Sequence, residues 1–351
     1  MTRRWTTLAL LAVALLAPAA TAQDPLSDPA KVGPRMAALE TGRKVVDRLV
    51  VCFDEGSFLR EIGKWDAERY WPVLLWDSHL VPKFVSAFGP EQVLLAKPDA
   101  RKVGLEAALA AIGEARGGEA ARPLGVVLLA EGSPELLGGV AVAAGRMQTP
   151  IVLETEKKHA TRIPHDEMEA LRKRLRTAVG KVVRLEDVDF VTVANDMPFA
   201  YSPPPDVHPG AYTVDDAAAR EDDLTRWAWI GRLVGGPVRS VYMAMGALFL
   251  RPEKALVFSR YAPNHAAFGP YDPKPPVLEA LGAFFEVEAV RHPKATLARW
   301  REIQWPAGNR FGFVFVNSSG GATSWSTSKG GATHFDVPDS VPAVVHYTHS
   351  G

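Results

Sequence analysis

From about Arg43 onward, short apolar runs alternate with segments whose apolar residues recur at helical spacing. Continuous apolar runs are typical of strands buried on both faces of a parallel sheet. The expected strands are Arg48–Phe53, Pro72–Trp76, Gln92–Ala96, Leu124–Ala130, Pro150–Glu154, Lys181–Leu185, Phe190–Ala194, Lys254–Ser259, Val287–Val290, Phe311–Val316 and Ala343–Tyr347. The expected helices are Lys102–Ala115, Pro134–Met147, His165–Val179, Pro237–Leu250, Pro276–Phe285 and Lys294–Gln304. The alternation predicts the α/β class, with two Rossmann-like or flavodoxin-like parallel sheets and helices on both faces.

An internal repeat supports this prediction. The segment Val50–Ser57 recurs 76 residues later as Val126–Ser133, with two valines and a Glu-Gly-Ser triplet at matching positions. Pro72–Leu75 is matched by Pro150–Leu153, at an offset of 78. Each repeat predicts a strand, a glycine turn, a serine-capped helix and a proline-led strand. A phosphate-binding loop is the alternative, but the neighbouring glutamate would repel phosphate.

Residues 201–216 interrupt the alternation, because they gather proline and glycine, which helices and central strands exclude. We therefore expect a linker there, between subdomains at 43–200 and 217–351. The second subdomain contains a long Gly-, Ser- and Thr-rich loop, Asn317–Thr333. The sequence stops at Gly351 directly after a predicted strand, which favours a truncated reading frame over a partner that completes the sheet.

The first 22 residues have the pattern of a secretory signal peptide. Arg3 and Arg4 precede the apolar run Leu8–Ala17, and Ala20-Thr21-Ala22 supplies small residues for cleavage before Gln23. The apolar run is too short for a membrane anchor, which needs about 20 residues. The pattern predicts export to the periplasm, the cell surface or the medium, by the general or the twin-arginine route. Residues 23–42 are expected to form a flexible lead.

Composition narrows the function classes. The 40 basic and 40 acidic residues balance, and they form no basic stripe, so nucleic acid is not an expected partner. No later stretch is apolar and long enough to cross a membrane. The only cysteine, Cys52, lies in an apolar strand, so we expect a buried small side chain rather than a nucleophile, and no internal disulfide.

Polar side chains follow the last two predicted strands. Asn317, Ser318 and Ser319 follow the first, and His349 and Ser350 follow the second. If these strands are parallel neighbours, their ends meet at one sheet edge, where open α/β sheets bind ligands. A Ser–His pair there would suit a hydrolase, with histidine accepting the hydroxyl proton. The alternative is a polar loop that satisfies its own backbone.

The sequence contains no G-x-S-x-G, H-E-x-x-H, Walker or dinucleotide motif, and no cofactor is expected. His165-Asp166-Glu167 lacks a second histidine and is interpreted as a helix start. A zinc site is an alternative for a group of side chains near the C-terminus, but its spacing fits no standard site, so no metal is expected. That group consists of His334, Asp336, His346 and His349.

The second half of the chain resembles the gingipain-type cysteine peptidases of the caspase-like clan. Asp223–Leu233, which ends in Ile-Gly-Arg-Leu, is similar to that family's aspartate-to-Gly-Arg segment ahead of a helix. Ala255–Tyr261 and the two polar-ended strands continue the resemblance over roughly residues 190–351. The resemblance implies a caspase-like second subdomain.

In that family, the first of the two strands ends in a catalytic His-Gly and the second in a catalytic cysteine. Here Asn317-Ser318 and His349-Ser350 occupy those places. The resemblance therefore implies a pseudoenzyme. The first half is similar to the cell-wall-binding repeats of exported bacterial proteins, mainly through Thr149–Leu153.

Three functions follow as hypotheses. The first is a non-catalytic surface or binding protein on a gingipain-type scaffold. The second is a secreted, peptidase-like hydrolase that uses Ser318 or Ser319 with His349. The third is a binder of cell-envelope polysaccharide through the repeated first half. The expected partner is accordingly a peptide, a protein or a cell-wall polysaccharide.

Overall fold

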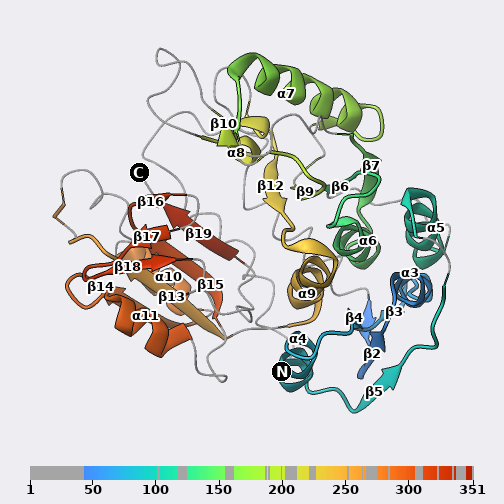
Figure 1. Cartoon of the computed structure of the whole chain (residues 1–351), viewed down its shortest axis with the longest axis horizontal. Helices are drawn as coiled ribbons and strands as arrows, with labels where there is room; N and C mark the ends of the chain where they lie inside the picture. Colours follow the sequence, from blue (N-terminus) through green and yellow to red (C-terminus); the bar gives the residue numbers. More distant parts are fainter. Residues whose placement is uncertain are drawn as a thin grey trace. The chain divides into compact units, whose positions relative to one another are not determined.

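The computed structural model describes most of the chain after residue 42. The described residues are 43–100, 103–117, 125–154, 162–185, 188, 190–198, 200–201, 212–220, 227–250, 253–262, 264–265, 275–283, 285–304, 311–321, 324–333, 336 and 345–349. The predicted signal peptide and flexible lead lie outside them. The described residues form parallel sheets flanked by helices, which confirms the α/β class (Figure 1). None of their helices has the length and apolarity to cross a membrane.

The described residues belong to two compact units that divide after Phe249. The first unit contains a three-stranded parallel sheet of order β4-β2-β5 and a four-stranded parallel sheet of order β7-β6-β9-β12. These strands are β2 Arg48–Cys52, β4 Val73–Leu75, β5 Gln92–Leu95, β6 Gly125–Leu129, β7 Thr149–Val152, β9 Phe190–Ala194 and β12 Trp229–Arg232. The helices are α3 Glu55–Ile62, α4 Leu80–Phe88, α5 Leu105–Ala115, α6 Leu136–Gly145, α7 His165–Gly180, α8 Val214–Ala218 and α9 Gly236–Phe249.

Short strands complete the first unit. β1 pairs with β3 in parallel, and β10 pairs with β8 in parallel and with β11 in antiparallel orientation. Their bounds are β1 Lys44–Val45, β3 Arg69–Tyr70, β8 Arg162–Ile163, β10 Ala200–Tyr201 and β11 Tyr212–Thr213.

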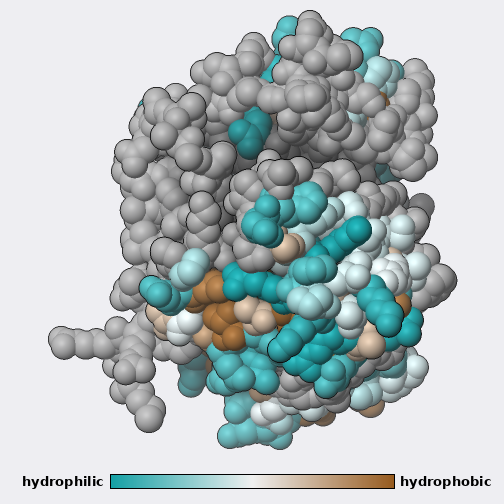
Figure 2. All heavy atoms as spheres, turned by 90° about the vertical axis from the view of Figure 1, so that its left-hand side faces the viewer, coloured by the Kyte–Doolittle hydropathy of each residue, from teal (hydrophilic) through white to brown (hydrophobic). Residues whose placement is uncertain are grey.

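The second unit has one four-stranded parallel sheet of order β14-β13-β15-β19, and a small antiparallel sheet of order β16-β17-β18. The strands are β13 Lys254–Ser259, β14 Glu286–Arg291, β15 Phe311–Asn317, β16 Gly320–Gly321, β17 Ser324–Ser326, β18 Gly331–Thr333 and β19 Val345–His349. The helices are α10 Pro275–Gly282 and α11 Leu297–Gln304. The side of this unit that Figure 2 faces is mainly hydrophilic, with a small hydrophobic patch.

The three larger sheets share one topology. In each, the chain forms a strand, a helix, a second strand, a helix and a third strand. The first of these strands lies between the second and the third in the sheet. The predicted internal repeat corresponds to the likeness between the first two of these sheets. Val50 pairs with Val73, and Val126 pairs with Thr149, so the register repeats at the offset of 76 found in the sequence. The proline match at 78 is displaced by two residues from this register.

Helix α6 lies at the centre of the first unit. All ten of its residues are buried, and it packs against α9, α5, α3 and strands β6 and β9. Its small residues allow close approach, since a Cβ added at Gly138 would lie 2.7 Å from the backbone of Ser240 in α9. Arg43 donates to the carbonyls of Ala144 and Gly145, both at 2.9 Å, where α6 leaves its last carbonyls without helical partners.

The predicted boundary at 201–216 differs from the observed division. β12 continues the second sheet beside β9, with Ile230 opposite Val191, and α9 packs on α6. The described residues of 217–249 therefore belong with the first unit.

Three local predictions are wrong. Lys181–Leu185 forms no strand, because the amides of Val182 and Val183 both donate to Val179 and close the end of α7. Asp54, not a serine, caps α3 by accepting from the amide of Ser57 at 2.7 Å. The segment 317–333, predicted as a loop, contains β16, β17 and β18.

Candidate functional site at a carboxyl sheet edge

The carboxyl ends of the four strands in the second unit's large sheet lie side by side. Arg291 of β14 pairs with Ser259 of β13, Ser259 with Asn317 of β15, and Asn317 with His349 of β19. The two strands β15 and β19 are parallel neighbours, which is the condition on which the expected shared edge depends. Their polar ends meet at one edge because strands that pair in parallel also end together.

Asn317 and Ser318 are both fully buried. The Asn317 amide nitrogen donates to the Ser259 hydroxyl at 3.3 Å, and that hydroxyl donates to the carbonyl of Tyr261 at 3.3 Å. The Ser318 hydroxyl lies against two carbonyls, those of Ser319 at 3.1 Å and of Ser326 in β17. Its proton is thus engaged by the backbone, and the side chain fastens the small sheet to the end of β15.

Ser319 and Arg260 form the half-buried part of the edge. The Arg260 Nη1 donates to the Ser319 hydroxyl at 2.6 Å. The Arg260 backbone is fixed from both sides, since its amide donates to Asn317 at 3.0 Å and its carbonyl accepts from the Ser328 hydroxyl at 3.2 Å. In the described part of the chain, no carboxylate lies within ion-pair distance of this guanidinium.

Arg260 is absent from the predicted site residues. Its signal in the sequence is a charged residue directly after the buried strand Lys254–Ser259. The predicted Ser–His pair is only partly located. The backbone of His349 lies beside Asn317, whereas Ser350 lies outside the described residues. The catalytic role of these side chains stays a prediction.

Asp336, one member of the alternative metal group, is engaged in other contacts. Its carboxylate accepts from Arg301 at 2.6 Å and from the amide of Thr333 at 2.8 Å. Burial acts to raise the pKa of Asp336, but the hydrogen bonds from Thr333 and Arg301 outweigh it and lower the pKa. Within the described ranges, no three His, Cys, Asp or Glu side chains lie close enough to share a metal ion. His334 lies outside these ranges.

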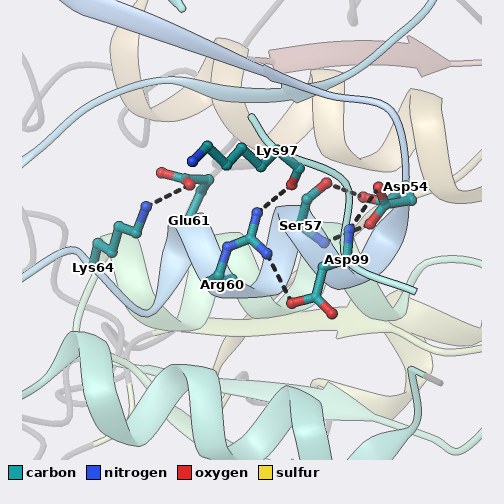
Figure 3. A network of polar contacts seen from close by, with 7 residues as sticks. All are labelled: Asp54, Ser57, Arg60, Glu61, Lys64, Lys97 and Asp99. Atoms are coloured by element: carbon teal, nitrogen blue, oxygen red, sulfur yellow. Dashed lines mark hydrogen bonds and ion pairs between the residues drawn. The ribbon is translucent and has the colours of Figure 1, made fainter. Parts of the chain in front are cut away.

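The first sheet of the first unit has a different polar edge, drawn in Figure 3. Arg60 of α3 bonds the carboxylate of Asp99 at 2.9 Å and the carbonyl of Lys97, which both follow β5. The Asp99 amide donates to Asp54 at 3.2 Å. The amide of Ser57 is the main cause of the lowered pKa of Asp54. These bonds tie the chain that leaves β5 to the start of α3.

Cys52 is fully buried next to this edge, as the sequence predicted. Burial raises the pKa of its thiol to about 12. A thiol that stays protonated at neutral pH is a poor nucleophile.

The second sheet's edge is held by Arg232, the arginine of the Gly-Arg segment. Its guanidinium makes a bidentate pair with Asp215 of α8, at 3.1 and 2.6 Å. It also donates to the carbonyls of Met197 and Pro198, which follow β9. The Arg232 side chain is only 6% exposed, so these bonds satisfy it inside the fold.

The resemblances drawn from the sequence rest on these local segments alone. Comparison of the chain with protein-family models, curated proteins and solved structures found no match. The likeness to gingipain-type peptidases and to cell-wall-binding repeats therefore stays a prediction.

Proposed function

We propose that the chain is an exported binding protein without hydrolytic activity, and that it binds a carboxylate-bearing peptide or protein at the carboxyl edge around Arg260. One observation carries this proposal. Each large sheet has an arginine at its carboxyl edge, paired with Asp99 in the first and with Asp215 in the second. In the third, Arg260 meets the neutral hydroxyl of Ser319.

A guanidinium has five N–H donors arranged to match a carboxylate. The Ser319 hydroxyl takes one of these donors, and the described residues offer no anion to the others. Helices α10 and α11 follow β13 and β14 in a parallel sheet, so both begin at this same edge. Their N-termini carry partial positive charge, which favours an anionic ligand over a neutral polysaccharide.

The geometry argues against a hydrolase at this edge. Ser318 is buried and its hydroxyl lies against backbone carbonyls. Ser319 receives a hydrogen bond from a cation, and its proton has no acceptor among the described side chains near it. Export rests on the predicted signal peptide in residues 1–22.

Binding can be tested with a matched ligand pair: acetyl-Ala-Ala with a free carboxylate and the same peptide as its amide, measured by calorimetry. We expect the acid to bind and the amide to bind weakly. Hydrogen bonds to charged groups contribute about 1.5–3 kcal/mol. Arg260→Gln should therefore reduce affinity roughly 10- to 150-fold.

Two further variants sharpen the experiment. Arg174→Gln removes an exposed arginine from α7 and should leave affinity unchanged. Ser319→Asp should pair with Arg260 as Asp215 pairs with Arg232, and should abolish binding. Equal affinity for acid and amide, or full binding by Arg260→Gln, would contradict the proposed site.

The hydrolase hypothesis has its own test. A fluorophosphonate probe labels a serine that a neighbouring base activates. We expect no labelling of the full chain. Labelling that is lost in Ser319→Ala but kept in Ser328→Ala would replace the binding protein with an enzyme.

A further inference from the structure

Strand β5 exposes three consecutive apolar side chains at the edge of its sheet. Val93, Leu94 and Leu95 are 47%, 41% and 66% exposed, and Gln92–Leu95 contains no charged residue. Figure 1 shows β5 on the outer side of the first unit, and within the described residues β2 is the strand that pairs with it. Single exposed apolar residues are common, but a run of them on an open edge strand invites pairing with another strand.

Two of the other edge strands carry features that disfavour pairing. β14 contains the charged residues Glu286, Glu288 and Arg291, and β7 contains Pro150, which has no amide to donate. The third strands of the other two sheets, β9 and β15, are each covered by a further strand, β12 and β19. Among the described residues, β5 differs from β9 and β15 because no strand pairs with its outer side.

The ends of β5 are fixed in place. The amide of Glu91 donates to the carboxylate of Asp47 at 3.0 Å, just before the strand. After it, Arg60 holds the carbonyl of Lys97 and the carboxylate of Asp99, as Figure 3 shows. A strand that is ordered before it meets its partner loses less conformational entropy on pairing.

The direction of the backbone groups limits the register of any partner. The amide of Ala96 donates to Val51 of β2 at 2.8 Å, so Leu94 and Ala96 use their backbone groups toward β2. Because this direction alternates along a strand, Val93 and Leu95 present their amides and carbonyls outward. A partner strand must therefore bond Val93 and Leu95.

The sequence around β5 is complementary to itself in reverse. When two copies run antiparallel around Leu94, Val93 of one lies opposite Leu95 of the other, which is the hydrogen-bonded pair that the backbone requires. The same register places the exposed Glu91 of one copy opposite the exposed Lys97 of the other. If the axis lies one residue away from Leu94, Glu91 of one copy no longer lies opposite Lys97 of the other.

We propose that the chain forms a symmetric dimer in which β5 of one copy pairs antiparallel with β5 of another, around a two-fold axis at Leu94. The interface is isologous, as two-fold dimers require, and it joins two three-stranded sheets into one. It uses only the first unit and does not depend on the ligand proposed for Arg260.

Engineered cysteines test both the dimer and its register. At the axis, the two Leu94 residues form a non-hydrogen-bonded pair with Cα atoms about 4.5 Å apart, which a disulfide can span. Leu94→Cys in the full chain should thus give a covalent dimer under mild oxidation. Gln92→Cys is the matched control, because its two copies would lie roughly 14 Å apart. The buried Cys52 should add no background.

Charge exchange gives an independent test by sedimentation. Glu91→Lys places two lysines together at each end of the interface, and Lys97→Glu places two glutamates together, so either should raise the dissociation constant of the dimer. The double exchange should restore the native value. Val182→Lys, at an exposed apolar position outside β5, should change nothing.

Two results would overturn the proposal. One is a chain that stays monomeric at every concentration up to its solubility limit, which would leave β5 to a different protein. The other is cross-linking of Gln92→Cys as readily as Leu94→Cys, which would rule out the axis at Leu94. A restored dimer in the double exchange, together with selective cross-linking at Leu94, would support it.

Discussion

Gly138 and Gly113 allow the same substitution to be tested with opposite expected signs. Both lie within helices, α6 and α5, where alanine is favoured over glycine by about 0.8–1.0 kcal/mol. A Cβ at Gly113 meets no atom within 4 Å. A Cβ at Gly138 lies 2.7 Å from the carbonyl carbon and oxygen of Ser240. Those are backbone atoms inside α9, so no side-chain rotation relieves the overlap.

The sizes of the two effects follow from these contacts. Gly113→Ala should stabilise the fold by about 0.5–1 kcal/mol. Gly138→Ala gains the same preference but overpacks a buried helix pair, which costs about 1–3 kcal/mol and more where backbone must move. Because the helix preference is the same in both, the gap between the two variants equals the overpacking cost, about 1–3 kcal/mol or more, and we expect a net loss in Gly138→Ala.

Urea unfolding, followed by circular dichroism, measures the gap as opposite shifts of the midpoint. Hydrogen exchange of the α6 peptide localises it, since opening of the α6–α9 contact should speed exchange there in Gly138→Ala alone. A Gly138→Ala chain as stable as the native one would show that α6 and α9 are not in close contact, and would refute the assignment of α9 to the first unit.

Three further outcomes are expected. The lowered pKa of Asp54 means that its stabilising effect is present above the unfolded value of 3.8 and is lost as pH falls through the folded value; Asp54→Asn should flatten the acid limb of an unfolding-free-energy profile. Cys52 should resist iodoacetamide at pH 8 in the native chain and react once urea unfolds it. Arg232→Leu leaves the half-buried Asp215 carboxylate without its partner, so it should destabilise by about 1–3 kcal/mol in a chemical denaturation curve.

The sequence predicts the central strands of this fold well and its long-range pairings poorly. Runs such as Lys254–Ser259 and Phe190–Ala194 match the observed strands, because continuous apolar residues are typical of strands covered on both faces. The strand Trp229–Arg232 is not predicted from the sequence, because its tryptophan, glycine and arginine interrupt any apolar run. It is recognised by its pairing with β9 in the structure. The expected linker at 201–216 precedes this strand, whereas the two compact units divide after Phe249.

The candidate site shows a similar limit. That Asn317 and His349 lie side by side follows from two apolar runs with polar ends, if the strands are parallel. That Ser318 is a structural residue does not follow, because its hydroxyl partner, the carbonyl of Ser326, is brought close only by the hairpin that β17 forms. The role proposed for Arg260 depends on its neighbour being the neutral hydroxyl of Ser319, and the sequence alone does not reveal that contact.

Comparison of the three sheets supports a ligand-binding role for Arg260 more strongly than the surroundings of Arg260 alone. Repeated topology gives each sheet a carboxyl edge at which chain segments leave and helices begin, and each edge holds an arginine. Where Asp99 or Asp215 pairs with the arginine, the internal ion pair neutralises its charge, and that arginine has no net charge to offer a ligand. Ser319 accepts one hydrogen bond but brings no negative charge, so the third edge keeps a positive group that an incoming carboxylate can neutralise.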